Sequence, residues 1–238
     1  MSKPKAIFCW SGGKDSAFAL HKVLSEGTYD VKYLLTTVNK QFRRISMHGI
    51  REELLDAQVA SIGIPLIKIL VSEGTNAEYE QLMGDALLKA KAEGIEHIIF
   101  GDIFLDDLRA YREANLSKSG FTAVFPLWKS DTRELVSRFI AAGFKTITTC
   151  ISDGYLGEQW CGRIIDEQLV AELPDNVDPC GENGEYHTFC FDGPIFRQAI
   201  PFTIGEKTYR PLECPPEPSS DTEQPAVTTR GFWFCDLT

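Results

Sequence analysis

Short apolar runs alternate with amphipathic stretches along the first half of the chain, and this order constrains the fold more than any other feature of its 238 residues. Strands separated by helices of this length form βαβ units, in which helices cover both faces of a parallel sheet. Right-handed crossovers then favour a doubly wound, mostly parallel α/β fold. The predicted elements are strands at residues 6–10, 31–38, 66–71 and 95–100, and helices at residues 16–25, 51–61 and 77–92.

The second half of the chain is less regular. Residues 152–192 contain many Gly, Pro, Asn and Asp residues, which favour irregular structure. We therefore expect a first domain over residues 1–128 and a smaller C-terminal α+β domain over residues 129–238. The elements predicted in this half are strands at 122–125, 145–151 and 201–209, helices at 107–116 and 132–142, and a short helical piece at 163–173.

The end of the chain combines a proline-rich stretch with an apolar one. Residues 211–225 carry five of the 12 prolines and are expected to form an exposed loop. Residues 231–235 are too apolar for a free tail, so we expect them to pair with the strand at 201–209. The side chains expected in the core are Phe18, Leu20, Val23 and Leu24 on one helix face, and Phe232, Trp233 and Phe234 near the C-terminus.

Composition and charge exclude several classes of protein. The formal net charge of −10 argues against a chain that grips a nucleic-acid backbone. A mean hydropathy of −0.14 and the lack of an apolar run of about 18 residues argue against a membrane span. Seven scattered cysteines without a C-x-x-C pair, and four histidines without ligand spacing, give no sign of disulfides or zinc. We expect a cytoplasmic protein whose partners are small molecules.

Residues 11–16, Ser-Gly-Gly-Lys-Asp-Ser, join the first predicted strand to the first predicted helix. Two glycines let the backbone turn tightly and approach a ligand, and the helix directs free N–H groups and its positive dipole end at the loop. The hydroxyls of Ser11 and Ser16 and the ammonium of Lys14 add donors for an anion. The loop therefore indicates a phosphate site. The alternative, a plain turn capped by Ser or Asp, would not need Gly-Gly-Lys.

Two common phosphate-binding motifs do not fit this loop. A Walker A sequence would need a glycine at Phe8 and a hydroxyl residue at Asp15, and the Gly-x-Gly-x-x-Gly pattern is absent. The loop instead resembles the PP-loop of the N-type ATP pyrophosphatases, whose signature is Ser-Gly-Gly-x-Asp-Ser. The resemblance implies a HUP-type (adenine nucleotide alpha hydrolase-like) sheet and cleavage of ATP between its α and β phosphates.

Further segments narrow the resemblance. They are Met-His-Gly-Ile-Arg at 47–51, Gly-Asp-Ile at 101–103, Phe-Pro-Leu-Trp at 125–128, Cys-Gly-Glu-Asn-Gly-Glu-Tyr-His-Thr at 180–188, and Asp-Gly-Pro-Ile-Phe at 192–196. With the loop, this order resembles the diphthine–ammonia ligase family, whose C-terminal signature reads Gly-Glu-Gly-Gly-Glu-Tyr-Glu-Thr and then Asp-x-Pro-x-Phe. The resemblance covers residues 6–196 and joins two unusual motifs roughly 170 residues apart.

The resemblance implies an amide ligase that adenylates a carboxylate with ATP and lets ammonia displace AMP. It implies ATP contacts from Ser11, Gly12, Gly13, Lys14, Asp15, Ser16 and Arg51. Asp102 is expected to contact the nucleotide or its metal, because it follows the predicted strand at 95–100 and ligands bind at the carboxyl ends of strands in doubly wound sheets; the alternative is a turn-making Asp. It implies catalytic roles for Lys14, Asp15, Glu185 and His187, and acceptor contacts from His48, Glu182, Glu185, Tyr186 and Thr188. Mg²⁺ is expected at Asp15 and Asp102, because Mg²⁺ on nucleotide phosphates usually takes one or two carboxylates.

Several positions depart from the family pattern or allow two interpretations. Asn183 and His187 stand where the signature has Gly and Glu, and residues 101–105 differ from the Gly-Ala-Ile-x-Ser of archaeal and eukaryotic enzymes. His187 is either a general base for the amine or a buried structural residue. His48 either contacts a ligand or belongs to a loop, and Trp128 either stacks on adenine or packs in the core.

The departures resemble the bacterial branch of the family. Since bacteria do not make diphthamide, the reaction type carries over to this chain and the acceptor does not. Two alternatives stay open: amidation of a small-molecule carboxylate, such as a cobalamin-pathway intermediate, and an ATP-binding regulatory protein without turnover. The carboxylate-rich second motif argues against the regulatory protein. The sequence leaves open the acceptor, the amine source and whether the chain forms a homodimer.

Overall fold

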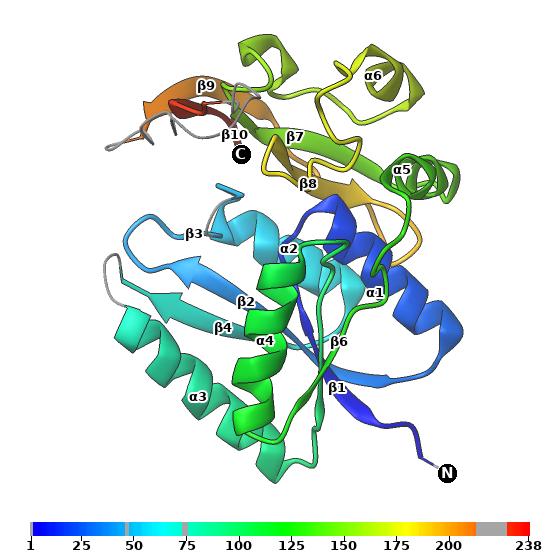
Figure 1. The fold of residues 1–238 in the computed structure, drawn as a ribbon, viewed down its shortest axis with the longest axis vertical. Coiled ribbons are helices and arrows are strands. Elements are labelled where there is room, and N and C mark those ends of the chain that lie inside the picture. The colour runs from blue at the N-terminus through cyan, green and yellow to red at the C-terminus, as the bar shows by residue number, and fades with distance from the viewer. Residues whose placement is uncertain (1, 46–47, 73–75, 213–227) are drawn as a thin grey trace.

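The structure, a computed structural model, describes residues 2–45, 48–72, 76–212 and 228–238. It contains a larger, mostly parallel sheet and a separate antiparallel sheet, as the sequence predicts in outline (Figure 1). Of the expected proline-rich loop, residues 213–225 lie outside the described residues. Within the described ranges, no helix has the length and apolarity needed to cross a bilayer.

Five parallel strands form the larger sheet, in the order β4-β2-β1-β5-β6. They are β1 (Lys5–Cys9), β2 (Asp30–Asn39), β4 (Leu66–Val71), β5 (His97–Ile99) and β6 (Thr122–Val124). The chain builds outward from β1 to β4 and then returns to β5 on the other side of β1. This is the doubly wound order that the sequence predicts, and its switch point lies between β1 and β5.

Helices cover both faces of this sheet. Successive residues of β1 alternate between the two faces, so Phe8 packs with α1 and α2, whereas Ile7 packs with α3 and α4. The helices are α1 (Lys14–Glu26), α2 (Glu52–Ile62), α3 (Asn76–Ala92) and α4 (Asp106–Lys118). Leu24, expected in the core, is 42% exposed, because α1 turns it to the solvent side of the face that buries Leu20 and Val23.

The second sheet is antiparallel, in the order β8-β7-β10-β9. Its strands are β7 (Lys145–Ser152), β8 (Tyr186–Asp192), β9 (Ile204–Pro211) and β10 (Gly231–Leu237). The predicted pairing of the apolar C-terminal stretch is confirmed, because β10 pairs with β9 and also with β7. Residues 232–234 are only half-buried, however, because β10 adjoins the edge strand β9, which is exposed along most of its length. Around it lie α5 (Thr132–Ala141), the 3₁₀ turn η1 (Glu158–Trp160) and α6 (Glu167–Glu172).

Two strands were not predicted from the sequence. The first, β3 (Arg44–Ile45), is two residues long and runs antiparallel to β2 beyond the end of β1. The second, β8, lies inside the stretch predicted to be irregular, because the Gly, Asn and Asp residues just before it hide its apolar alternation. Both strands lie near the carboxyl ends of the parallel strands, and β8 belongs to the core that joins the two sheets.

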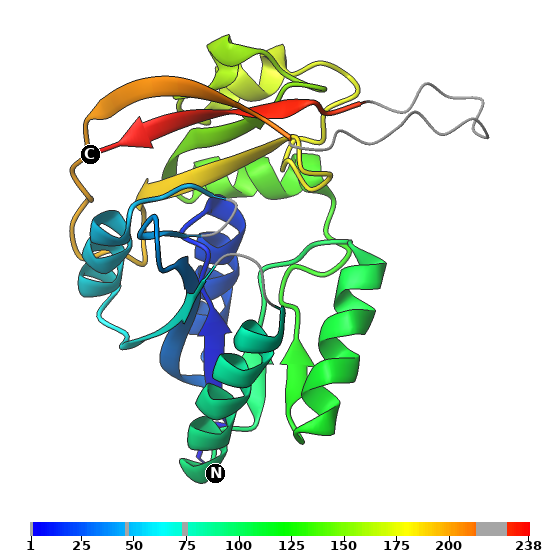
Figure 2. The same cartoon turned by 90° about the vertical axis from the view of Figure 1, so that its left-hand side faces the viewer.

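The two sheets share one hydrophobic core. A single cluster of buried side chains runs from β1, α1 and α2 to β7, β8 and β10, and it includes Phe8, Leu20, Leu55, Ile147 and Phe189. The carboxyl ends of the parallel strands point at the antiparallel sheet (Figure 2). Ligand sites in open α/β sheets lie at such ends, so a ligand of this chain would lie between the two layers.

Candidate functional site

The glycine loop lies at the switch point of the parallel sheet. Strand β1 runs into it, and the neighbouring strand β5 ends just before Gly101 and Asp102. A Cβ on Gly101 would lie 3.1 Å from the backbone nitrogen of Ser16, so the glycine permits the close approach of this turn to α1. The structure thus brings residues 11–16 and 101–102 together, as the sequence predicts from the fold class.

The loop itself carries hydroxyl and N–H groups at the start of α1. Gly12 has φ +80°, which favours glycine, and Gly13 is the N-cap of α1 without a side chain to occupy the cap. The N–H of Gly13 donates to Ser11 Oγ (3.3 Å), and Ser11 Oγ lies 3.1 Å from Ser16 Oγ. Hydroxyls and N–H groups at a helix N-terminus are suited to bind a phosphate group.

Lys14 is buried beneath this loop, with 3% of its surface exposed. Its Nζ lies 2.7 Å from each carboxylate oxygen of Asp15, donates to the carbonyl oxygen of Cys180, and sits 5.6 Å from the centre of the Tyr186 ring. Burial alone would lower the pKa of Lys14, but Asp15 and the other acidic groups raise it above its ordinary value. The side chain is therefore a permanent cation at the predicted phosphate site.

Strand β8 contacts the loop directly. The Lys14 N–H, at the start of α1, donates to Thr188 Oγ1 (3.0 Å), and the Cys190 N–H donates to the carbonyl oxygen of Gly12 (2.8 Å). The first of these bonds connects Lys14 and Thr188, which are 174 positions apart in the chain. The structure places the two sequence motifs in one site, with Thr188 acting on the first turn of α1.

Gln58 of α2 is a site residue that the sequence did not single out. Its side chain, with no exposed surface, donates to the carbonyl oxygens of Gly12 (3.0 Å) and Cys190 (2.6 Å) and accepts from Trp10 Nε1 (3.0 Å). The sequence does contain a sign of this role, because Gln58 is a polar residue on the same apolar helix face as Leu54 and Leu55. A buried amide has to find partners, and here they are the loop and β8.

Two histidines lie next to the loop. The ring centres of His48 and His187 are 4.8 Å apart, and His48 Nδ1 lies 3.3 Å from the carbonyl oxygen of Thr188. Burial lowers the pKa of His48, and burial, His48 and Lys14 lower that of His187 to about 3. Both rings are therefore neutral near pH 7. A Cβ on Gly13 would lie 3.0 Å from His48 Cε1, so His48 packs against the loop.

Carboxylates converge on the other side of Lys14. Glu182 accepts from the N–H of Ile103 (3.3 Å), and burial followed by Asp15 raises its pKa to about 8. Asp102 Oδ2 lies 3.1 Å from Arg112 Nε, and burial raises the pKa of this carboxyl although Arg112 lowers it. Asp102 Oδ2 is one of the buried polar atoms with no hydrogen-bond partner among the described residues. Both oxygens of Asp102 thus face the Arg112 guanidinium as an ion pair, and the described residues contain no group of three or more His, Cys, Asp or Glu side chains placed to hold a metal ion.

Glu185 lies in a different environment from the one expected of a catalytic carboxylate. It has no exposed surface, and its oxygens accept from the N–H groups of Asp178 (2.8 Å) and Asn183 (2.8 Å) and from Asn183 Nδ2 (2.9 Å). The hydroxyl of Tyr186 similarly donates to the carbonyl oxygen of Pro179 (2.5 Å). In this structure both side chains shape the turn that precedes β8.

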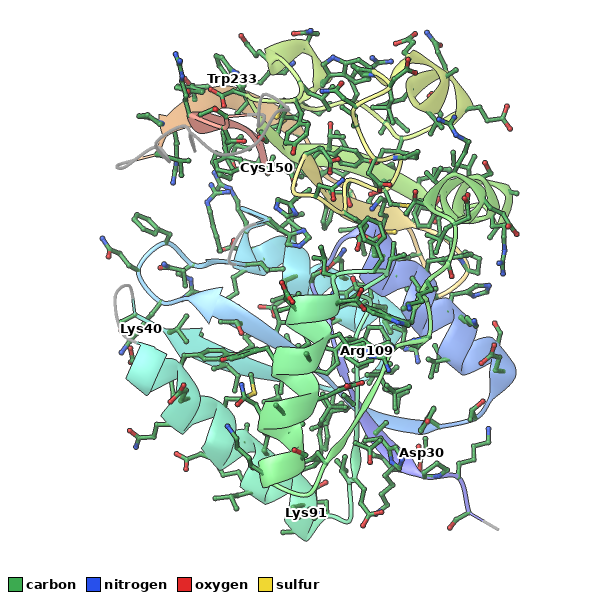
Figure 3. The ribbon with its side chains drawn as sticks, in the orientation of Figure 1. Asp30, Lys40, Lys91, Arg109, Cys150 and Trp233 are labelled. Atoms are coloured by element: carbon green, nitrogen blue, oxygen red, sulfur yellow. The ribbon has the colours of Figure 1, made fainter. Side chains whose placement is uncertain are left out.

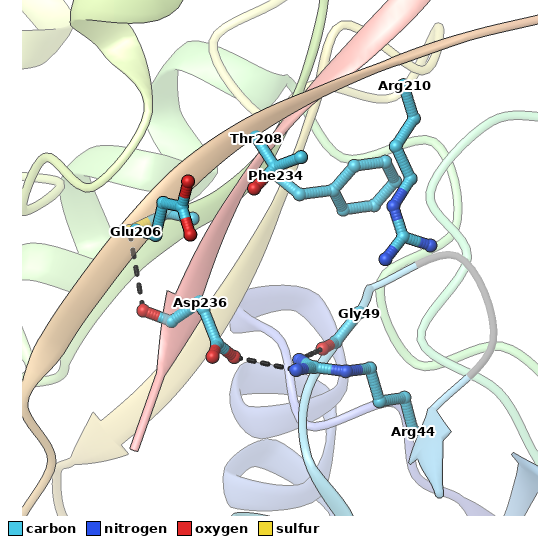
Figure 4. A pocket seen from close by; sticks show the side chains of 8 residues that line it. Arg44, Gly49, Glu206, Thr208, Arg210, Phe234 and Asp236 are labelled. Carbon is cyan, nitrogen blue, oxygen red and sulfur yellow. Dashed lines mark hydrogen bonds and ion pairs between the residues drawn. The ribbon is translucent and has the colours of Figure 1, made fainter. Parts of the chain in front are cut away.

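Arg51 pairs with a carboxylate of the C-terminal strand. Its guanidinium forms two hydrogen bonds with Asp236 of β10 (3.0 and 2.5 Å), and Arg44 adds a third at 2.8 Å. The hydrogen bonds from Arg51 hold the pKa of Asp236 near 2. Beside this ion pair is a pocket between the two sheets (Figure 4). It is lined by Arg44, Gly49, Glu206, Thr208, Arg210, Phe234, Cys235 and Asp236.

Trp128 lies at the end of β6 and is half-buried. The guanidinium of Arg109, a residue of α4 that is labelled in Figure 3, sits 4.6 Å from the Trp128 ring centre and 5.0 Å from that of Phe125. Neither of the two alternatives, a core residue or a ring that stacks on adenine, is fully supported. Trp128 is not a core residue, and one face of its ring is covered by an arginine.

Comparison with known proteins agrees with the two motifs. The chain matches the family model of the diphthamide synthase N-terminal domain over residues 4–122 and that of the C-terminal domain over residues 131–212. It is 26% identical to the diphthine–ammonia ligase of Mus musculus, over 80% of this chain and 79% of that protein. The Danio rerio protein of the same name is also 26% identical, with 80% and 83% covered. The Saccharomyces cerevisiae one is 24% identical, with 81% and 33% covered.

Proposed function

We propose, from the premise that the chain belongs to the diphthamide synthase family, that it is an ATP-dependent ligase that joins ammonia to a carboxylate. The name of its relatives, diphthine–ammonia ligase, supports this reaction class over a regulatory protein without turnover. The observation that carries the proposal is the contact of Lys14 with Thr188 and with Cys180, because it unites the phosphate loop and the carboxylate-rich motif in one site.

The proposed reaction has two steps. A carboxylate oxygen of the acceptor attacks the α phosphorus of ATP, the bond between the α and β phosphates breaks, and pyrophosphate leaves. Ammonia then attacks the carbonyl carbon of the acyl-adenylate, the bond to AMP breaks, and the nitrogen loses a proton to give the amide. Lys14 and the N–H groups of the loop stabilise the charge that develops on the departing pyrophosphate. Such preorganised donors commonly lower barriers by several kcal/mol.

Asp15 and Asp102 fit the Mg²⁺ that accompanies ATP. Mg²⁺ usually binds protein through one or two carboxylates and takes its other ligands from phosphates and water. Asp15 is partly exposed beside the loop, and Asp102 follows the end of β5 with its carboxylate ion-paired to Arg112. When bound, Mg²⁺ would neutralise phosphate charge. We assign ATP binding to residues 1–128 and acceptor binding to residues 129–238.

The residues of the second motif have distinct proposed roles. His187 has a pKa near 3, so it is neutral but a weak base, and we assign it to orienting the amine rather than to removing its proton. Glu182 faces Asp15 and Lys14 and is proposed to contact the acceptor. Glu185 and Thr188 act by holding the turn before β8 and the first turn of α1.

Product analysis tests the proposal. The full chain is incubated with Mg²⁺, ATP and ammonium and with a panel of carboxylates, diphthine among them, and AMP and pyrophosphate are quantified. We expect equal amounts of both with an accepted carboxylate, and a loss of at least 100-fold in Lys14→Met and Asp15→Asn. Lys22→Met is the matched control, since Lys22 lies on the same helix and bonds the carbonyl oxygen of Pro126 instead. ADP and orthophosphate as the sole products would contradict the proposal.

A further inference from the structure

The side-chain amide of Gln58 forms its hydrogen bonds with the phosphate loop and with residues next to the loop. Its two amide hydrogens go to Gly12 O (3.0 Å) and Cys190 O (2.6 Å), and its oxygen accepts from Trp10 Nε1 (3.0 Å). Burial is complete, so water does not compete for these bonds. Gln58 thus connects α2, the residue after β1, the loop and β8 through one side chain.

These bonds fix the orientation of one peptide plane. Gly12 O accepts from Gln58 and also from the N–H of Cys190 (2.8 Å), so the carbonyl points toward α2 and β8. The C=O and N–H of a trans peptide point in opposite directions, and no described peptide is cis. The N–H of Gly13 therefore points the other way, toward Ser11 Oγ at 3.3 Å. That is the side of the loop on which its hydroxyls gather.

Glycine makes this orientation depend on outside support. Gly12 has φ +80° and Gly13 lacks a side chain, so the plane between them could rotate with little local hindrance. A Cβ on Gly12 would lie 2.9 Å from Gln58 Oε1, which shows how closely the amide is fitted against the loop. The contacts that oppose rotation come from Gln58 and Cys190.

We infer that Gln58 is a positioning residue: it holds the Gly12–Gly13 peptide so that the Gly13 N–H faces the pyrophosphate of ATP, and it couples this geometry to β8. The inference rests on the proposed function, because it takes the loop to be the pyrophosphate site. Losing one hydrogen bond to a charged group weakens binding by about 1.5–3 kcal/mol. That corresponds to a loss of roughly 10- to 100-fold in affinity.

The test measures binding of inorganic pyrophosphate to the full chain by calorimetry at 10 °C. We expect Gln58→Met, which keeps the shape and loses the donors, to bind pyrophosphate at least 10-fold more weakly. Ser61→Ala is the matched control, because Ser61 is an equally buried residue of α2 whose hydroxyl bonds Gln198 O (2.7 Å) rather than the loop. It should bind pyrophosphate within twofold of wild type, although it also loses a buried hydrogen bond.

A second measurement uses the wild-type chain, so it does not depend on the variant folding. In ¹⁵N-resolved NMR spectra, pyrophosphate should shift the Gly13 amide resonance, and the Gln58 side-chain amide should stay protected from exchange. Failure of wild type to bind pyrophosphate would overturn the proposed function. Binding by wild type with an unmoved Gly13 resonance would overturn the role of Gln58 alone. Equal affinities of wild type and Gln58→Met, or equal losses in Gln58→Met and Ser61→Ala, would do the same.

Discussion

Thr188→Val should destabilise the protein through the first turn of α1. The substitution keeps the shape of a side chain that is 2% exposed and removes the oxygen that accepts the Lys14 N–H at 3.0 Å. Among the described contacts this is the bond that satisfies that N–H, which has no partner within the helix. An unsatisfied buried N–H costs about 1–3 kcal/mol. For a chain of this size each kcal/mol lowers Tm by about 2–4 °C, so we expect a fall of roughly 2–12 °C.

Urea unfolding at pH 7, followed by circular dichroism, gives the free energy of unfolding of each variant. Thr146→Val is the matched change: Thr146 of β7 is equally buried, and its hydroxyl donates to Phe189 O (2.9 Å) rather than bonding a residue of the loop. Both variants should lose stability, but only Thr188→Val should also weaken pyrophosphate binding, because only it frees the start of α1. A Thr188→Val protein within 0.5 kcal/mol of wild type would refute the reasoning, as would an equal loss of pyrophosphate affinity in Thr146→Val.

Three other outcomes follow from the site. Burial and neighbouring carboxylates raise the folded-state pKa of Glu182 to about 8. The free energy of unfolding should therefore fall as pH rises from about 5 to 8, by at most about 1.4 kcal/mol per pH unit. In urea titrations, Glu182→Gln should remove this pH dependence. Hydrogen bonds from arginine hold the pKa of Asp236 near 2, so Asp236→Asn should lower the free energy of unfolding by about 1–2 kcal/mol at pH 7. The difference from wild type should shrink as pH falls from 5 to 2, and a difference that stays constant would contradict this. Gly12 has φ +80°, and a Cβ there would lie 2.9 Å from Gln58 Oε1, so Gly12→Ala should lower the urea midpoint and abolish pyrophosphate binding. Gly84→Ala in α3 should do neither, because a Cβ on Gly84 has open space around it.

The local pattern of the chain predicted most of the secondary structure and the phosphate loop. Each parallel strand is a buried apolar run, and each helix repeats its apolar residues at helical spacing, so neighbours in the sequence carry the information. The loop at residues 11–16 is equally local: two glycines, a lysine and two hydroxyls precede a helix start, and this is enough to indicate an anion site. Strand β8 escaped prediction because polar turn residues adjoin it.

Partners across the chain could not be predicted in the same way. Arg51 was predicted to contact ATP from its place in a motif, and nothing in the sequence indicated its ion-pair partner Asp236, 185 residues away. Glu185 was predicted to be catalytic from its place in the second motif, and only the structure reveals that the turn folds around it and uses both of its oxygens. Gln58 looked like one polar residue on an apolar helix face, and its role follows only from Gly12 and Cys190 lying beside it.

The sequence alone therefore determined the α/β class, the doubly wound parallel sheet and the chemistry of the loop, because these depend on residues within a few turns of one another. The tertiary structure decided which residues complete the loop: Thr188, Cys190 and Gln58 reach it from elements 46 to 178 residues distant. Such contacts form only when the two sheets pack on one core. Each polar group buried there then needs a hydrogen-bond partner within the protein.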